Sequence, residues 1–147
     1  MKKLNVKENL CIGCRQCELA CSLYNEGQFN PSLARIRVIY DQKTNTYSPN
    51  TCRNCSRPKC LEACAAGALA FNRETGVVVY DRDKCARCYE CVKACPFKAI
   101  YIAEKGYILK CDLCGGNPVC VRLCSPRPEK SSPLMNNQEG EQALNYY

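Results

Sequence analysis

The segment Cys85-Ala-Arg-Cys88-Tyr-Glu-Cys91-Val-Lys-Ala-Cys95-Pro-Phe-Lys-Ala-Ile100 holds four cysteines at spacings of two, two and three residues. The first three lie within seven residues, so their thiols can surround one polynuclear metal site. Cys95 follows Cys91 by about one helical turn, and its side chain is expected to point away from that site. The segment therefore needs a second motif of its kind elsewhere in the chain.

Three further motifs of this kind are present, and we number all four in chain order. Motif one (11–21) repeats the same spacing, whereas motif two (52–64) and motif four (111–124) are longer between their second and third cysteines. The segment 85–95 is motif three. The motifs use all 16 cysteines of the 147-residue chain: Cys11, Cys14, Cys17 and Cys21; Cys52, Cys55, Cys60 and Cys64; Cys85, Cys88, Cys91 and Cys95; Cys111, Cys114, Cys120 and Cys124.

The cysteines are expected to bind metal rather than to form disulfides. The first ten residues, Met1 to Leu10, lack the apolar core of a secretory signal, and no apolar run approaches the roughly 18 residues of a membrane span. We therefore expect a reducing, cytoplasmic setting, in which many cysteines indicate metal. A partner subunit with its own export signal could still carry the chain across a membrane.

The spacing favours iron–sulfur clusters over zinc. Structural zinc sites usually join two C-x2-C pairs across a longer spacer, whereas C-x2-C-x2-C-x3-C-P is the ligand run of bacterial [4Fe–4S] ferredoxins. In two-cluster ferredoxins the fourth cysteine ligates the other cluster. The chain contains no histidine, which excludes Rieske centres, His-ligated haem and His-dependent acid–base catalysis. We expect four [4Fe–4S] clusters and no catalytic residue, because all 16 cysteines belong to complete motifs.

The formal charge of +7 counts every thiol as neutral. A [4Fe–4S] core with four thiolates carries about −2, so four clusters would contribute about −8. The loaded protein would be close to neutral, and nucleic-acid binding loses its electrostatic support.

Between the motifs the sequence predicts short helices and hairpins. A helix is expected over 15–23, a strand over 35–39 with a hairpin turn at Thr44-Asn45, and hairpins over 67–80 and 99–110. The widened loop of motif two, 56–59, is expected to be exposed, either as a docking feature or as padding. Because the apolar core is thin, folding should depend on the clusters. The tail 126–147 is expected to be disordered or to dock on a partner.

The motifs resemble those of the four-cluster, ferredoxin-like electron-transfer subunits of molybdenum and tungsten oxidoreductases, such as formate dehydrogenase, hydrogenase-linked and dimethyl-sulfoxide-reductase-type beta subunits. Motif one, together with 26–32, 35–38 and 110–120, is similar to the small subunits that accompany tungsten-pterin aldehyde oxidoreductases. The small subunit of a benzoyl-CoA reductase complex is closely similar to these. Lys98 departs from the pattern, because relatives commonly have Gly there.

The resemblance implies an α+β fold, a duplicated 2[4Fe–4S] ferredoxin-like fold with short helices and small hairpins. Residues 1–125 would form two interleaved halves, motifs one with four and two with three, and each motif would lend its fourth cysteine to the other's cluster. The implied ligand quartets are quartet 1 (Cys11, Cys14, Cys17, Cys124), quartet 2 (Cys52, Cys55, Cys60, Cys95), quartet 3 (Cys85, Cys88, Cys91, Cys64) and quartet 4 (Cys111, Cys114, Cys120, Cys21).

The resemblance also implies a function: an electron-transfer subunit that relays electrons between a catalytic tungsten- or molybdenum-pterin aldehyde oxidoreductase subunit and an external redox partner. A flavin subunit linked to NAD is a further implied partner, and the tail could support higher-order assembly. The alternatives are a free soluble polyferredoxin or the beta subunit of a benzoyl-CoA reductase, formate dehydrogenase or hydrogenase complex. A zinc-binding nucleic-acid module is the third possibility.

Overall fold

The computed structural model describes residues 3–124. Its first long helix, α1 (Gln16–Glu26), contains the third and fourth cysteines of motif one. The helix ends at Gly27, whose φ is 71° and whose N–H bonds to the carbonyl of Leu23. It therefore continues three residues past the predicted end at Leu23, because the chain holds no helix-breaking residue before Gly27.

The three predicted hairpins are confirmed. Strands β1 (Ile36–Asp41) and β2 (Thr46–Thr51) pair antiparallel with Ile36 opposite Thr51, and Asn45 turns the chain with a φ of 52°. Strands β3 (Leu69–Asn72) and β4 (Val77–Tyr80) form the second hairpin. Strands β5 (Ile100–Ile102) and β6 (Ile108–Lys110) form the third.

The remaining helices are short, and each carries the third cysteine of a motif. They are α2 (Lys59–Glu62), α3 (Glu90–Ala94) and α4 (Val119–Leu123). Single 3-10 turns lie at η1 (Glu8–Leu10), η2 (Pro31–Leu33) and η3 (Leu113–Gly116). Helices of four or five residues are not stable alone in water, so packing must hold them.

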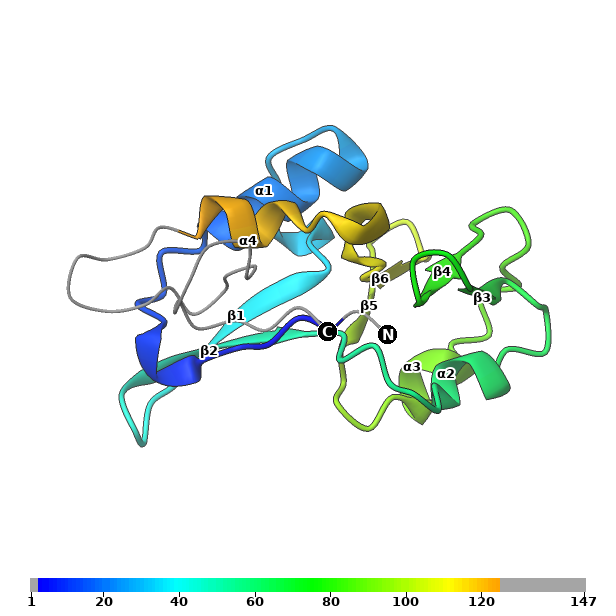
Figure 1. Ribbon diagram of the computed structural model, residues 1–147, viewed down its shortest axis with the longest axis horizontal. Helices are drawn as coiled ribbons and strands as arrows, with labels where there is room; N and C mark the ends of the chain where they lie inside the picture. Colours follow the sequence, from blue (N-terminus) through cyan, green and yellow to red (C-terminus); the bar gives the residue numbers. More distant parts are fainter. Residues whose placement is uncertain (1–2, 125–147) are drawn as a thin grey trace.

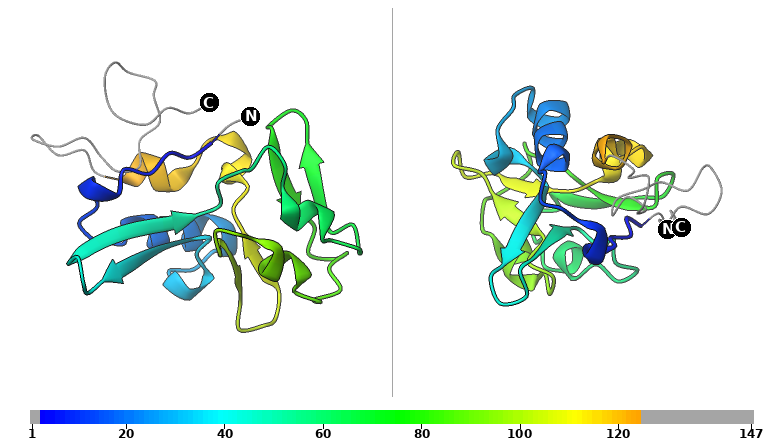
Figure 2. Two further views of the ribbon diagram at one scale, coloured as in Figure 1. Left: turned by 90° about the horizontal axis from the view of Figure 1, so that it is seen from below. Right: turned by 90° about the vertical axis from the view of Figure 1, so that its left-hand side faces the viewer.

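The helices pair in the order 1–4 and 2–3. Helix α1 packs against α4, and α2 packs against α3. Figure 1 shows α1, α4 and the β1–β2 hairpin at one end of the molecule, with α2, α3 and the β3–β4 hairpin at the other and β5–β6 between them. The two turned views in Figure 2 show the same arrangement. The described residues thus form a small domain of short helices and antiparallel hairpins, as the sequence predicts.

Cysteines form a substantial part of the buried core. One cluster of buried residues combines Ile36, Val38 and Leu113 with Cys17, Cys21 and Cys120, and a second combines Leu69 and Ile108 with Cys60 and Cys91. The predicted tail, 126–147, lies outside the described residues. Within residues 3–124, no helix combines the length and the apolar character that crossing a membrane requires.

Candidate metal centres

The backbone around the second cysteine of each motif turns through the left-handed region. Positive φ values flank this cysteine in motif one (Gly13, 75°; Arg15, 58°) and in motif three (Arg87, 55°; Tyr89, 61°). Asn54 and Leu113 precede the corresponding cysteines of motifs two and four with φ values of 44° and 58°.

Left-handed backbone at these positions is costly. A non-glycine residue pays roughly 1–2 kcal/mol there. Turns of this kind can point successive backbone N–H groups to one side, which makes an anion-binding concavity of the type seen at phosphate and iron–sulfur sites. The repetition of the same strained turn in all four motifs fits loops that enclose an anionic group.

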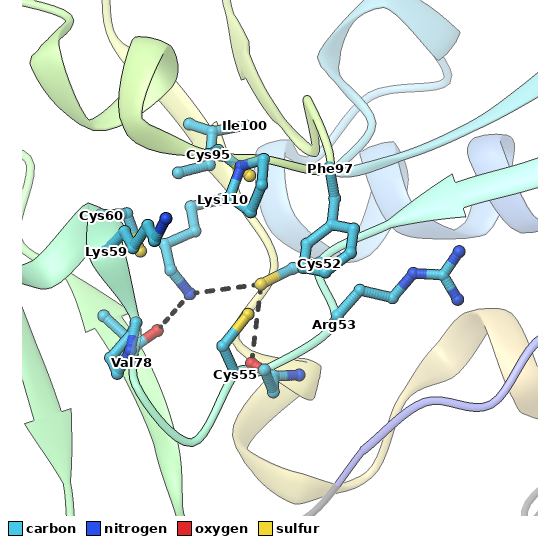
Figure 3. Close-up of a pocket in the computed structure, with 13 residues that line it drawn as sticks. Cys52, Arg53, Cys55, Lys59, Cys60, Val78, Cys95, Phe97, Ile100 and Lys110 are labelled. Carbon is cyan, nitrogen blue, oxygen red and sulfur yellow. Dashed lines mark hydrogen bonds between the residues drawn. The ribbon is translucent and has the colours of Figure 1, made fainter.

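Quartet 2 lines a cavity (Figure 3). Cys52 and Cys55 come from the loop after β2, Cys60 from α2 and Cys95 from the end of α3. Phe97 and Ile100 add apolar walls. Cysteines from motifs two and three, remote in sequence, therefore meet around one space, and all of the cavity's cysteines belong to quartet 2.

Quartet 3 lines a second cavity. Cys85, Cys88 and Cys91 come from the motif-three loop and the start of α3, and Cys64 comes from the end of motif two. Tyr80, Tyr89 and Ile108 are among the remaining walls. In each of the two cavities, three cysteines of one motif thus lie with the fourth cysteine of the other.

The cysteines of motifs one and four interact electrostatically in two groups. Burial and the neighbouring Glu18 carboxylate raise the pKa of Cys17 to about 12, and the charges of Cys124, Cys11 and Cys14 add to this. Burial raises the pKa of Cys120 well above its ordinary value, with contributions from Cys111, Cys21 and Cys114 in that order. Cys17 thus interacts with the other members of quartet 1, and Cys120 interacts first with those of quartet 4 and then with Cys17.

Burial differs systematically within the quartets. The third cysteine of every motif and Cys21 are buried, Cys14 and Cys88 are exposed, and the other cysteines are intermediate. Among the described residues, no three or more His, Cys, Asp or Glu side chains are arranged to hold a single metal ion. Donor sets made of cysteine alone are those that [4Fe–4S] clusters use, so the residues fit such a group.

Comparison with known families agrees with this donor set. Residues 43–130 match the family model described as the 4Fe-4S dicluster domain, and residues 8–25 match a 4Fe-4S binding domain. The chain belongs to the 4Fe-4S dicluster ferredoxin family.

Several relatives of this ferredoxin are known by name. The polyferredoxin-like subunit of an aliphatic sulfonate oxidoreductase from Pyrococcus furiosus is 46% identical over 115 residues, which are 78% of this chain and 66% of that protein. A probable anaerobic dimethyl sulfoxide reductase chain from Escherichia coli is 34% identical, with 88% and 72% covered. The chain thus spans about two thirds of the length of the archaeal relative.

A solved structure also aligns with this ferredoxin. It is the active-site complex BamBC of benzoyl coenzyme A reductase, with a TM-score of 0.49 and 26% identity, and the alignment covers 84% of this chain and 72% of that one.

Adjacent quartets of the ferredoxin also interact. Burial and then the charge of Cys52 raise the pKa of Cys111 to about 12, which links quartets 2 and 4. Burial raises the pKa of Cys91 to about 11, and Cys60 of quartet 2 contributes after Cys64 and Cys85. Cys17 of quartet 1 contributes to the raised pKa of Cys120 in quartet 4.

Several sulfur atoms accept hydrogen bonds from outside the quartets. The backbone N–H of Arg35 donates to Cys21 Sγ at 3.2 Å, and Asn25 Nδ2 donates to the same sulfur at 3.6 Å. The N–H of Ala99 donates to Cys95 Sγ at 3.5 Å. Such hydrogen bonds raise the potential of a cluster, since they stabilise the more negative reduced state.

Sequence reasoning missed three polar residues beside the quartets. Glu18 is buried next to Cys17, and its Oε1 accepts a hydrogen bond from the N–H of Val38 at 2.6 Å. Asn54 and Lys110 are buried beside Cys52. Two of these residues had a sign in the sequence: Glu18 is a carboxylate inside motif one, and Lys110 ends the apolar run before Cys111.

Proposed function

We propose that this chain is the electron-transfer subunit of an oxidoreductase complex and carries four [4Fe–4S] clusters, one in each of quartets 1 to 4. The observation that carries the proposal is the cavity in which Cys52, Cys55 and Cys60 meet Cys95 of the next motif. In two-cluster ferredoxins, too, three cysteines of one motif and the fourth cysteine of the other hold one cluster. The interacting cysteines of motifs one and four support the same exchange there. Residues 1–125 would thus contain two interleaved ferredoxin-like halves.

The clusters would lie in a row in the order 3, 2, 4, 1. The support is the pairwise interaction of Cys91 with Cys60, of Cys111 with Cys52 and of Cys120 with Cys17. The two exposed cysteines, Cys88 and Cys14, belong to quartets 3 and 1, the two ends of that row. Electrons would therefore enter and leave through the terminal clusters, while the inner two are more enclosed.

The protein's own contribution is to position and shield the clusters. Each [4Fe–4S] cluster supplies a one-electron carrier. The buried third cysteine of each motif would hold its cluster on the side away from water, and the left-handed loops beside the second cysteines would suit an anionic core. The chain contains no histidine and its 16 cysteines all belong to the four quartets, so we assign substrate turnover to a partner.

We propose a tungsten- or molybdenum-pterin aldehyde oxidoreductase as the catalytic partner, with a flavin subunit linked to NAD as the external redox partner. The support is the likeness of motif one and of 110–120 to small subunits of that class. The names of the relatives, a polyferredoxin-like subunit and a reductase chain, are those of parts of oxidoreductase complexes. The exposed, basic loop 56–59 beside quartet 2 offers one docking feature.

The test is anaerobic purification of the native protein from its source, followed by metal analysis. We expect about sixteen iron atoms per chain, absorbance near ~400 nm, and a stoichiometric large subunit that contains tungsten or molybdenum. A clean monomer with about sixteen iron atoms would instead establish a free polyferredoxin. Zinc in place of iron would overturn the proposal altogether.

A further inference from the structure

Lys110 is a cation enclosed within the protein at the end of β6. The residue is 3% exposed, and its Nζ donates hydrogen bonds to the carbonyl oxygens of Val78 at 2.7 Å and Cys111 at 3.0 Å. The same nitrogen lies 3.8 Å from Cys52 Sγ, across 58 positions of sequence. Figure 3 shows the ammonium group turned toward the cysteines of quartet 2.

The charge of Lys110 reaches more than one cysteine. Lys110 lines the same cavity as Cys52, Cys55, Cys60 and Cys95 of quartet 2. Its hydrogen bond to the carbonyl oxygen of Cys111 also places the ammonium group beside the first ligand of quartet 4. Lys110 thus lies at the junction of quartets 2 and 4, where the two halves of the protein meet.

Within residues 3–124, no carboxylate forms an ion pair with Lys110. Two carbonyl oxygens and a sulfur surround the ammonium group instead. In a low-dielectric site a charge that no counter-ion neutralises acts strongly on its neighbours. The Lys110 charge would therefore act strongly on an electron added to a cluster in quartet 2.

We propose that Lys110 is a positioning residue for electron transfer, which raises the reduction potential of the cluster in quartet 2 and, to a smaller extent, of the cluster in quartet 4. The inference rests on the proposed function. Reduction makes a cluster more negative, so a fixed cation nearby stabilises the reduced state. Lys110 would thereby favour the electron on the clusters of quartets 2 and 4, which connect the two ferredoxin-like halves in one electron-transfer path.

A purely structural role for Lys110 makes different predictions. Its two hydrogen bonds to carbonyls join β4 to the start of motif four, so its removal can lower stability without any effect on potential. Two variants distinguish the effect of the Lys110 charge from the effect of its hydrogen bonds. Lys110→Gln keeps a donor and removes the charge, whereas Lys110→Arg keeps both.

The experiment compares wild-type holoprotein with Lys110→Gln, Lys110→Arg and Lys43→Gln in potentiometric titrations that are monitored by electron paramagnetic resonance. Lys43 is the matched control, because it is an exposed lysine in the turn between β1 and β2, outside the four motifs. Iron content and the guanidinium midpoint are measured for each protein. In Lys110→Gln we expect one midpoint potential to fall by at least about 30 mV, a threefold change in electron affinity at 59 mV per tenfold. Lys110→Arg and Lys43→Gln should match the wild type.

Unchanged potentials in a fully loaded Lys110→Gln protein would overturn the inference, as would equal shifts in the Gln and Arg variants. If Lys110→Gln does not hold its iron, the deciding measurement uses wild-type protein labelled with ¹⁵N at the lysine ε-nitrogen alone. A lysine ¹⁵N coupling to a reduced cluster, lost in labelled Lys110→Arg, supports the inference, and its absence overturns it. A wild type without any iron–sulfur signal would refute the proposed function itself, and the role of Lys110 with it.

Discussion

Arg82 binds the carboxylate of Glu26 through two hydrogen bonds, of 3.0 Å and 3.1 Å, although 56 positions separate the residues. The same carboxylate accepts hydrogen bonds from Arg35 at 3.1 Å and from the Tyr107 hydroxyl at 3.1 Å. The Arg82 guanidinium also lies 3.7 Å from the centre of the Tyr107 ring. Glu26 therefore connects the last turn of α1 to the segments before motif three and before motif four.

Replacing Glu26 by Gln should destabilise the loaded protein by about 2 kcal/mol, because a buried carboxylate with charged donors is lost and Arg35 keeps an unneutralised charge. The measurement is the guanidinium midpoint for loss of cluster absorbance. The control is Glu90→Gln, which breaks the exposed Glu90–Lys93 pair and should leave the midpoint unchanged. Equal effects of the two substitutions would contradict the assigned importance of Glu26.

Replacing Gly13 by Ala should impair assembly of the cluster in quartet 1. A Cβ at this position would stand 2.6 Å from the Tyr47 ring, and the φ of 75° is itself unfavourable for alanine. Gly27→Ala is the matched control, since its φ is 71° but its Cβ would meet nothing within 4 Å. The left-handed backbone should cost roughly 1–2 kcal/mol in both variants, and the ring contact a further 1–3 kcal/mol in Gly13→Ala alone. Iron content and thermal midpoint are the measurements, and identical losses would disprove the role of the Tyr47 contact.

Replacing Cys95 by Ala should release the cluster of quartet 2 first. Cys95 lines the cavity with Cys52 and Cys55 rather than the cavity of its own motif. Alkylation of the variant, followed by mass spectrometry, should therefore label Cys52, Cys55 and Cys60 before the motif-three cysteines.

The reciprocal variant, Cys64→Ala, should expose Cys85, Cys88 and Cys91 to alkylation first. If each substitution instead exposes the other cysteines of its own motif, the exchange of fourth cysteines between motifs two and three is wrong.

Removing iron with a chelator and an oxidant should abolish most of the far-ultraviolet circular dichroism. The helices of motifs two, three and four span only four or five residues, and cysteines occupy central places in both main clusters of buried residues. Without metal these elements cannot offset the entropy of ordering the chain. Reconstitution with iron and sulfide should restore the signal. An iron-free chain that keeps its helical spectrum and resists proteolysis would show that the apolar core suffices.

The hairpins were predictable from sequence because alternating apolar residues and turn residues are local signals. The left-handed backbone around the second cysteine of each motif was not predictable in this way. Arg15, Arg87 and Tyr89 carry no sequence sign of a positive φ, since residues of these types seldom adopt it. Lys98 has a φ of 49°, a backbone conformation that suits glycine better than lysine.

The cysteine spacing within each motif identified the kind of cofactor, because ligands that lie a few residues apart can surround one site wherever the motif lies in the fold. The place of Cys95 in the cavity of motif two, which the family resemblance implied, and the enclosure of Lys110 beside Cys52 both depend on the tertiary structure. The physical reason is that spacing constrains a few neighbouring residues, whereas the partners and burial of a side chain depend on how α2 packs on α3 and where β6 ends. Remote packing therefore selects the fourth ligand and the charge beside the site.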